Sequence, residues 1–405
     1  MISEKLLNPQ SIVVVGASND VQKPGGKLLK NLLDSQFKGQ IYVVNPKEAE
    51  IQGIKCHAKV EDLPQVDCAL MGIASKYCLH TVDVLANEKG CRGFVIISAG
   101  FSEENHEGAE IEHKIVEIID NVGGSLIGPN CTGFLNVNYT GAFDAPIPQL
   151  NPRGVDFVTG SGATAVFIKE IGITNGLQFN SVWAVGNSAQ IGIEEVLEYW
   201  DETYVDGQSA FVKMIYMESV RNPQKLLKHA SSLIRKGCKI AAIKSGSSSA
   251  GSRAASSHTG ALATSDVAVD ALFRKAGIVR CSNRLELVNV CSVFMHPEMK
   301  GKNVIELMHN IAAVGGEGVS AGVRMEISEK GELLNATIGG KPIEKKRTYR
   351  IATIDYLAEG NDKMYALKKH KKKYFMKKHA RDAMMESIIK NRTIDSKIEG
   401  RIIIK

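Results

Sequence analysis

Short apolar segments alternate with amphipathic segments along residues 1–300. The stretch SIVVVGAS, residues 11–18, is a β-branched run that ends in glycine, a pattern typical of a buried parallel strand that leads into a tight turn. The stretch KPGGKLLKNLL that follows predicts a loop and an amphipathic helix beginning near Gly25. Further apolar runs at IYVVNP, DCALMGIA, GFVIISAGF and SLIGPN are separated by helical patterns. This alternation predicts an α/β fold with a doubly wound parallel sheet.

A second series of the same kind follows a proline-rich connection. The connection, NYTGAFDAPIPQLNPRG, holds three of the 11 prolines. Strand patterns then recur at VDFVTG, SVWAVG, FVKMIYM and CKIAAIK. We therefore expect a Rossmann-like domain at 1–140 and a smaller flavodoxin-like domain at 150–300.

The composition changes near Lys302. Residues 1–302 contain 29 basic and 31 acidic residues, whereas the remainder contains 21 and 13, and all eight cysteines lie before this point. Two strand patterns flank EKGE in the remainder, and TYRIATIDYLA is a third. We expect 303–405 to be a partial α+β segment of different origin.

Several classes of function are disfavoured by the composition. No apolar run is long enough to span a bilayer, and the first residues lack the pattern of a secretory signal, so we expect a cytoplasmic protein without membrane contact. The cysteines are irregularly spaced, which indicates neither a metal site nor a disulfide framework. The basic run ALKKHKKKYFMKKHAR has no nucleic-acid-binding fold around it, and a solvated face is favoured over a nucleic-acid contact.

The first turn, VGASNDVQKPGG, could bind phosphate groups through backbone N–H groups and a helix N-terminus. Its spacing is not that of a dinucleotide-binding fingerprint, and the second strand ends in NPK. Lys47 thus places a cation where an NAD site has a carboxylate, which favours a phosphorylated nucleotide such as coenzyme A. A turn of this kind without a ligand stays open as an alternative.

Two polar positions are candidates for chemistry. Asn130, in IGPNCTG at a predicted strand end, could order a ligand or tie its own loop. His258 stands among small residues in SSHTGAL, and a histidine that accepts a phosphoryl group needs a carboxylate to hold its second ring nitrogen. Glu218, at the end of the strand pattern IYMES, could be that carboxylate. An ordinary exposed histidine is the alternative.

Together these residues resemble the NDP-forming acyl-CoA synthetases, the acetate–CoA ligase branch of the succinyl-CoA synthetase superfamily. The motifs VGAS, NPK, GPNC, VGNSA and SHTGALA occur in the family's order over residues 1 to about 302. The resemblance implies a CoA-binding Rossmann-like domain and a flavodoxin-like domain in which His258 is phosphorylated and Glu218 supports it. It implies CoA contacts near Gly16, Ser18, Lys23, Lys47 and Asn130, with Ser161 and Gly162 lining the acyl-phosphate pocket.

The family reaction converts acyl-CoA, ADP and phosphate into acid, CoA and ATP, in either direction. Phosphate forms an acyl phosphate, the histidine takes its phosphoryl group, and a swinging loop delivers that group to ADP. The resemblance does not extend to the ATP-grasp domain that uses ATP or ADP with Mg²⁺, so we expect an ATP-grasp beta-type subunit or domain as partner, in a hetero- or homo-oligomer. The chain departs from the family at Gly160, where a glutamine is usual, and in QIGIEE, where other acidic residues are usual.

The remainder resembles the latter part of the C-terminal domain of bacterial 5'-nucleotidases, through GVRMEISEKGELLNATIGGKPIEKKRTYRIATIDYLAEGNDKM. Asn361, Asp362 and Tyr365 match that family's nucleoside-binding loop. Because the resemblance covers only part of a domain, we expect this tail to lack half of its core. Two further functions therefore stay open beside the ligase: a CoA- or acyl-CoA-binding module without turnover, and a nucleotide-binding remnant of a 5'-nucleotidase.

Overall fold

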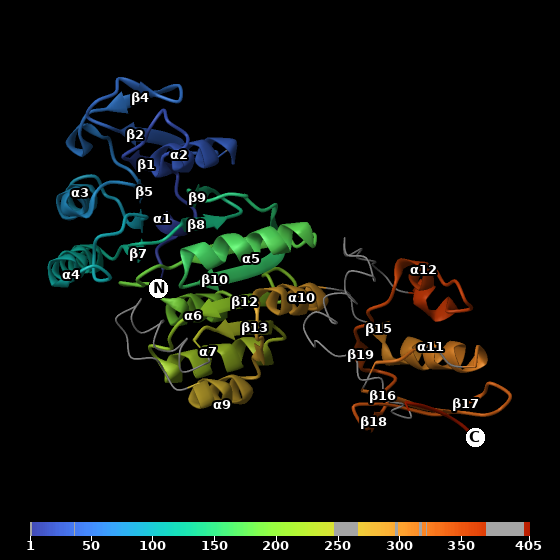
Figure 1. The fold of residues 1–405 in the computed structure, drawn as a ribbon. Coiled ribbons are helices and arrows are strands. Elements are labelled where there is room, and N and C mark those ends of the chain that lie inside the picture. Colours follow the sequence, from blue (N-terminus) through green and yellow to red (C-terminus); the bar gives the residue numbers. More distant parts are fainter. Residues whose placement is uncertain are drawn as a thin grey trace. The chain divides into compact units, whose positions relative to one another are not determined.

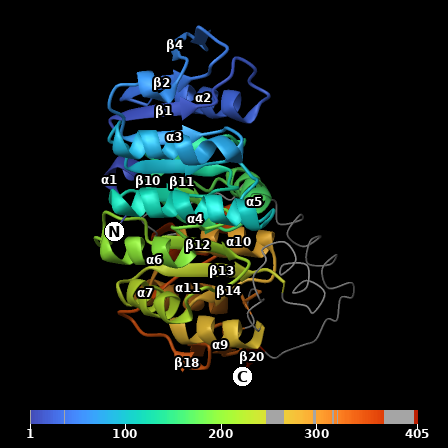
Figure 2. The ribbon, with the colours of Figure 1, turned by 90° about the vertical axis from the view of Figure 1, so that its left-hand side faces the viewer.

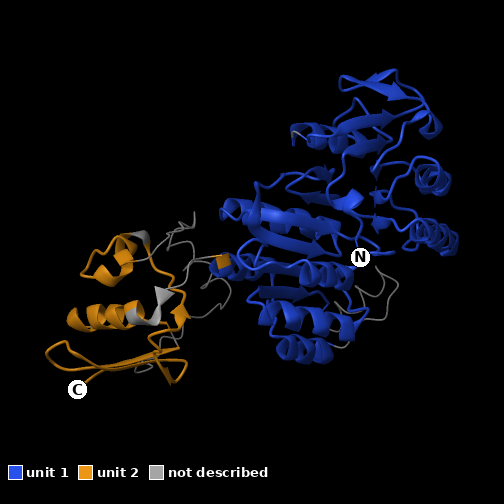
Figure 3. Ribbon diagram, turned by 180° about the vertical axis from the view of Figure 1, so that it is seen from behind, with its two compact units in different colours: residues 1–294 blue, residues 295–405 orange. Residues whose placement is uncertain are grey.

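The computed structural model describes residues 2–35, 37–246, 266–295, 299–315, 318–320, 322–369 and 401–405. The chain divides into two compact units, Met1–Phe294 and Met295–Lys405 (Figure 3). In these described ranges, the first unit contains two seven-stranded sheets, and the second contains a four-stranded sheet and a two-stranded one. The two units have separate hydrophobic cores.

The first sheet has the strand order β3-β4-β2-β1-β5-β6-β7. Its strands from β4 to β7 in this order run parallel, and β3 pairs antiparallel with β4. The strands are β1 (Ser11–Val15), β2 (Gln40–Val44), β3 (Glu50–Ile51), β4 (Ile54–His57), β5 (Cys68–Met71), β6 (Gly93–Ile96) and β7 (Ser125–Ile127). The helices are α2 (Pro24–Asp34), α3 (Ser75–Asn87) and α4 (His106–Asn121), with a 3-10 turn, η1, at Val60–Asp62.

Both faces of this sheet are buried, which explains why its strands are apolar throughout. In β1, Ile12 and Val14 belong to one core cluster, and Val13 and Val15 belong to another. Helices α3 and α4 cover one face of the sheet, and α2 covers the other (Figure 1). The expected Rossmann-like α/β fold of the first part is thereby confirmed.

The second sheet has the strand order β14-β13-β12-β10-β11-β8-β9. Strands β10 to β14 run parallel, and α7 packs between α6 and α9 (Figure 2). The strands are β8 (Gly133–Asn136), β9 (Thr140–Ala142), β10 (Leu150–Thr159), β11 (Phe179–Ala184), β12 (Val212–Met217), β13 (Lys239–Lys244) and β14 (Val279–Arg280). The helices are α5 (Gly162–Thr174), α6 (Ile193–Glu202), α7 (Pro223–Arg235), α9 (Asp266–Ala276) and α10 (Arg284–Met295).

The hairpin of β8 and β9 belongs to the second sheet, although the sequence led us to expect residues up to 140 in the first domain. Strand β8 pairs antiparallel with β11, and Phe134 lies opposite Trp183. Their ring centroids are 4.5 Å apart, and both side chains are fully or almost fully buried. Burial of this aromatic pair stabilises the hairpin on the second sheet. One core cluster consequently extends from the first sheet into the second.

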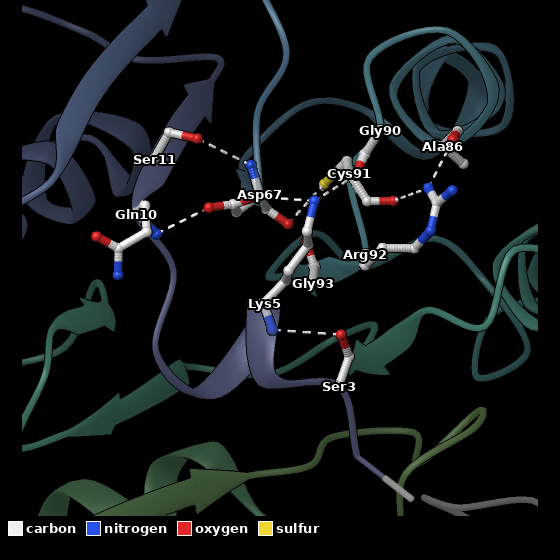
Figure 4. Close-up of polar contacts among 10 residues, drawn as sticks. All are labelled: Ser3, Lys5, Gln10, Ser11, Asp67, Ala86, Gly90, Cys91, Arg92 and Gly93. Carbon is white, nitrogen blue, oxygen red and sulfur yellow. Dashed lines mark hydrogen bonds and ion pairs between the residues drawn. The ribbon is translucent and has the colours of Figure 1, made fainter.

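A short N-terminal helix, α1 (Glu4–Leu7), is attached to the first sheet through Asp67 (Figure 4). The ammonium group of Lys5 lies 3.0 Å from Asp67 Oδ1, and the backbone N–H of Gln10 donates to Asp67 Oδ2 at 2.8 Å. Burial raises the pKa of the Asp67 carboxyl, but these donors and the contact with Ser11 outweigh burial, so its pKa lies below the ordinary value. The carboxylate therefore stabilises the fold in its charged form.

The second unit contains a sheet of order β18-β17-β16-β20, in which β20 is parallel to β16, and a separate pair of β15 and β19. The expected strands on either side of EKGE form the hairpin of β16 and β17, whereas only the first two residues of TYRIATIDYLA are a strand. The elements are β15 (Met299–Lys300), α11 (Gly301–Ala313), β16 (Val323–Ile327), β17 (Leu333–Ile338), β18 (Lys341–Pro342), β19 (Thr348–Tyr349), α12 (Asp355–Ala358), η2 (Tyr365–Lys369) and β20 (Ile402–Ile404).

The described part of the second unit has a hydrophobic core of its own. Leu307 and Ile311 of α11 pack with Met325 of β16 and with Leu367 of η2. The tail is thus better packed than the partial family resemblance led us to expect. The apolar residues of α11 lie on one face of the helix and contribute to this core. The strand patterns alone did not predict this helix.

We predict that Asp67→Asn lowers the free energy of unfolding by about 1 kcal/mol at neutral pH, because it removes the charged acceptor of the Lys5 ammonium group and of the backbone N–H of Gln10. A depressed native pKa stabilises the fold above the carboxyl's unfolded pKa, and this contribution is lost as the pH falls through the native pKa. The difference between variant and wild type should therefore shrink below about pH 4, as measured by urea unfolding. The control Asp62→Asn changes an exposed carboxylate and should have little effect. Equal losses in the two variants would contradict the prediction.

Candidate functional site

The first strand-to-helix turn is closely packed. Gly16 follows β1 with a φ of +83°, and a Cβ atom there would lie 2.5 Å from the carbonyl oxygen of Gly72. A Cβ atom on Gly25, in the first turn of α2, would lie 2.0 Å from the carbonyl oxygen of Gly16. Glycine meets both requirements. The N-terminus of α2 therefore lies against the carboxyl end of β1, in the arrangement that binds phosphate groups in this kind of fold.

Three polar residues expected to bind CoA lie around this turn. Ser18 is half-buried, and its hydroxyl accepts a hydrogen bond from a backbone N–H two residues later at 3.0 Å. Lys23 is the exposed residue before α2, and Lys47 is exposed in the turn after β2. The side-chain amide of Asn45 donates to the carbonyl oxygen of Ala17 at 2.9 Å and so joins the ends of β1 and β2. Both lysines consequently belong to one edge of the sheet.

Asn130 connects the carboxyl edges of the two sheets. It lies in the loop after β7 with a φ of +56°, and its backbone N–H donates to the carbonyl oxygen of Ser98 at 2.8 Å. Its side-chain amide donates to Asn187 Oδ1 at 3.3 Å. Ser98 follows β6 of the first sheet, and Asn187 follows β11 of the second. Of the two roles considered for Asn130, tying its loop is the one that these contacts support.

The loop after β11 lies directly on the loop that contains Asn130. Gly186 has a φ of +53°, and a Cβ atom on it would lie 2.2 Å from the carbonyl oxygen of Pro129 and 2.6 Å from that of Asn130. Backbone here contacts backbone, so no side chain fits between the loops. This contact sets the separation of the two strand edges.

Asn187 is the centre of a polar cluster that the sequence analysis did not single out. Its side-chain amide donates to Glu103 Oε2 at 2.5 Å, to Glu112 Oε2 at 2.9 Å and to the hydroxyl of Ser102 at 3.2 Å. Burial raises the pKa of Glu103, but hydrogen bonds from Asn187 and from the backbone N–H of Gly100 outweigh burial and hold it below its ordinary value. Glu103 and Asn187 lie in loops that follow strands β6 and β11, and that position was the available signal.

Ser161 and Gly162 begin helix α5, beside the loop that contains Asn130. Ser161 caps the helix, and its hydroxyl accepts from the backbone N–H of Thr164 at 3.4 Å. A Cβ atom on Gly162 would lie 2.7 Å from the methyl group of Thr132. The N-terminus of α5 is therefore close to the junction between the two sheets.

Glu218 is the first residue after β12, at the same edge of the second sheet. Thr159 of β10 lies opposite Tyr216 of β12, and Lys244 of β13 lies opposite Met217. The strand register therefore places the start of α5, Glu218 and the end of β13 side by side. His258 lies outside the described residues, in the segment 247–265 that follows β13.

The candidate nucleoside loop of the tail is held by internal contacts. The side-chain amide of Asn361 donates to the carbonyl oxygen of Tyr356 at 2.8 Å, and the Tyr356 hydroxyl donates to Asp362 Oδ1 at 3.2 Å. Tyr365 is 56% exposed. The hydrogen bonds of Asn361 and Asp362 thus stabilise their own loop.

The described residues contain no candidate site for metal binding or for thiol chemistry. No group of three or more His, Cys, Asp and Glu side chains there could hold a metal ion. All cysteines are free thiols, all but Cys56 are buried, and burial raises the pKa of Cys68 to about 12. No helix in the described ranges is both long and apolar enough to cross a membrane.

Three family models match the chain. The CoA binding domain matches residues 10–137, and the succinyl-CoA ligase like flavodoxin domain matches 152–294. The 5'-nucleotidase C-terminal domain matches 240–369, so it starts within β13, well before the position near 303 that the motifs indicated. Over 344 residues the chain is 35% identical to the alpha subunit of ADP-forming acetate–CoA ligase II of Pyrococcus furiosus, covering 84% of this chain and 72% of that one.

The chain belongs to the ADP-forming acetate–CoA ligase family. It is also 36% identical to the ADP-forming acetate–CoA ligase of Methanocaldococcus jannaschii, over 77% of this chain but 43% of that one. A solved structure with the same fold is the dinucleotide-forming acetyl-coenzyme A synthetase 1 of Ca. Korarchaeum cryptofilum, in complex with phosphate and ADP. Its TM-score is 0.67 and its identity 29%, over 77% of this chain and 68% of that one. This member of the ligase family thus spans less than half the length of the Methanocaldococcus jannaschii relative.

We predict that Gly186→Ala lowers the free energy of unfolding by about 3 kcal/mol, because the backbone carbonyls of Pro129 and Asn130 cannot move apart without separating the loops. The matched control is Gly207→Ala, at a φ of +74° with nothing within 4 Å of a Cβ atom. That substitution should cost about 1 kcal/mol of backbone strain only. Urea unfolding measures the free energy of unfolding of both variants. Equal losses of this free energy in Gly186→Ala and Gly207→Ala would show that the loop contact is not tight.

Proposed function

We propose that this chain is the alpha-type portion of an NDP-forming acyl-CoA synthetase, which interconverts acyl-CoA, ADP and phosphate with acid, CoA and ATP. The single observation that carries the proposal is the shared strand edge in a chain of this family. The strand register makes three features of this edge neighbours: the start of α5, Glu218 and the end of β13. His258 follows β13 in the sequence. That edge adjoins the junction with the CoA-binding sheet through the contact of Gly162 with Thr132.

CoA would bind at the carboxyl edge of the first sheet. Phosphate oxygens would bind at the close turn of Gly16 and at the N-terminus of α2, which carries a partial positive charge. Lys23 and Lys47 would contribute full positive charges to the phosphates of CoA. Ser18 shapes the loop, and Asn130, which ties the loop after β7, would border the CoA site near the sheet junction.

The acyl group would be transferred at the N-terminus of α5. An oxygen of inorganic phosphate attacks the thioester carbonyl, the C–S bond breaks, and CoA leaves as a thiolate that takes up a proton. The resulting acyl phosphate would lie against Ser161 and Gly162, where the helix N-terminus stabilises its negative charge.

His258 would then take the phosphoryl group. A neutral ring nitrogen attacks phosphorus, the bond from phosphorus to the acyl oxygen breaks, and the acid leaves as a carboxylate. Glu218 would accept the hydrogen bond of the other ring nitrogen and stabilise the positive charge that the imidazole develops. The N–P bond breaks when an oxygen of the ADP β-phosphate attacks, which regenerates the histidine.

The second half-reaction needs nucleotide-binding residues, which we assign to an ATP-grasp beta-type partner with Mg²⁺. The relatives named as alpha subunits support such a partner. Other relatives are named for different acids, trans-ferulate and 4-hydroxybutyrate, so the substrate class is a small carboxylic acid. A cytoplasmic location is part of the same proposal.

A second candidate is a CoA- or acyl-CoA-binding module without turnover. It is favoured by the second unit, which begins at Met295 and matches the C-terminal domain of a different enzyme. A nucleotide-binding remnant of a 5'-nucleotidase has less support, because Asn361 and Asp362 are engaged in their own loop.

We predict that incubation of the full chain with acetyl-CoA and labelled phosphate gives an acid-labile, base-stable phosphoenzyme, and that His258→Ala abolishes it. The control His113→Ala removes an exposed imidazole of α4, 75% accessible, and should label like wild type. Equal labelling of wild type and His258→Ala would contradict the phosphohistidine. CoA binding without any label would favour the binding module instead.

A further inference from the structure

Glu194 is a buried carboxylate at the start of α6, only 4% exposed. Its Oε1 atom accepts hydrogen bonds from the backbone N–H of Arg221 at 2.8 Å and from that of Asn222 at 3.1 Å. Burial of a charged carboxylate is costly unless strong donors satisfy it. The two backbone donors to Oε1 offset this cost, because hydrogen bonds to an ionised acceptor are stronger than those to a neutral one.

The turn that Glu194 holds is the one that contains Glu218. Glu218 follows the last residue of β12 by one position and precedes Arg221 by three. The other end of the turn is fixed as well, because Asn222 caps α7 by accepting from the backbone N–H of Lys225 at 3.0 Å. Glu218 therefore lies on a short segment that is held by the sheet on one side and by Glu194 on the other.

The side chain of Arg221 extends this support to the other sheet. Its guanidinium donates to the carbonyl oxygens of Ser188 at 2.5 Å and Asn187 at 2.6 Å. The amide of Asn187 in turn donates to Glu103, in the loop after β6. A continuous series of hydrogen bonds thus runs from the loop after β6 to the turn of Glu218.

We propose that Glu194 is a positioning residue for Glu218, and that it sets the place of this carboxylate relative to the CoA-binding sheet. The inference rests on the proposed role of Glu218 beside His258. Glu194 does not touch substrate, and acts through the backbone of Arg221 and Asn222. A carboxylate that must meet an imidazole at hydrogen-bond distance tolerates little displacement, since a shift of about 1 Å can cost on the order of 100-fold in rate.

The test compares the rate of phosphoenzyme formation from acetyl-CoA and labelled phosphate in the full chain. Glu194→Leu should lower this rate on the order of 100-fold, with the KM for acetyl-CoA unchanged. Glu194→Gln should restore most of the rate, because its amide oxygen can accept the same two hydrogen bonds. The matched control Glu198→Leu removes a carboxylate of the same helix that pairs with Lys225, and should label at the wild-type rate.

Glu194→Asp is the second variant, for the case in which the leucine variant does not fold. It keeps the charge, but its shorter side chain moves the acceptor oxygen away from the N–H groups of Arg221 and Asn222. Its rate should fall while its melting temperature stays close to that of wild type. If wild type forms the phosphoenzyme and a folded Glu194→Leu or Glu194→Asp forms it at the same rate, the positioning role is overturned and the proposed function stands. An equal loss of the rate of phosphoenzyme formation in the leucine and glutamine variants also overturns the positioning role. An unlabelled wild type overturns the proposed function and the inference together.

Discussion

The arrangement of the first unit depends on the close contact of two loops. Gly186 lies against the carbonyl groups of Pro129 and Asn130, with no room for a side chain. This contact joins the carboxyl edge of the second sheet to that of the first. Ser98, Asn130 and Asn187 lie in loops that start from these two edges. A looser contact would let the edges separate, and the hydrogen bonds across the junction would be lost with it.

The carboxylates at the junction are held by donors of the backbone and of amide side chains. Glu103 accepts from the N–H of Gly100 and from the Asn187 amide, and Glu194 accepts from the N–H groups of Arg221 and Asn222. Such donors are fixed by the fold, so they hold a charged group in one place with little further loss of entropy. Lysine charges are therefore not needed to neutralise these carboxylates. Lys23 and Lys47 are both exposed at the carboxyl edge of the first sheet.

Much of the fold could be predicted from the sequence, because parallel strands buried on both faces are apolar throughout and each is followed by an amphipathic helix. The hairpin of β8 and β9 could not, because the contact of Phe134 with Trp183 joins residues far apart in the chain. The prediction of a third strand in the tail was wrong beyond Tyr349. Its only partner among the described residues is the two-residue strand β15, so pairing ends after two residues. The core of the tail was missed for a similar reason: α11 supplies it, and strand patterns do not reveal a helix.

For the candidate site, the sequence by itself determined the residue types that the chemistry needs and their order. It indicated the glycine turn at Gly16, the lysines at Lys23 and Lys47, and a carboxylate after a strand at Glu218. Only the tertiary structure decided which strand ends are neighbours, and so which residues surround Glu218. Hydrogen bonds join Arg221, in the turn after β12, to Glu194 of helix α6 and to Asn187 of the loop after β11. A pattern along one chain contains no signal for such pairs, because their proximity arises from the strand order of the sheets and from the contact between them.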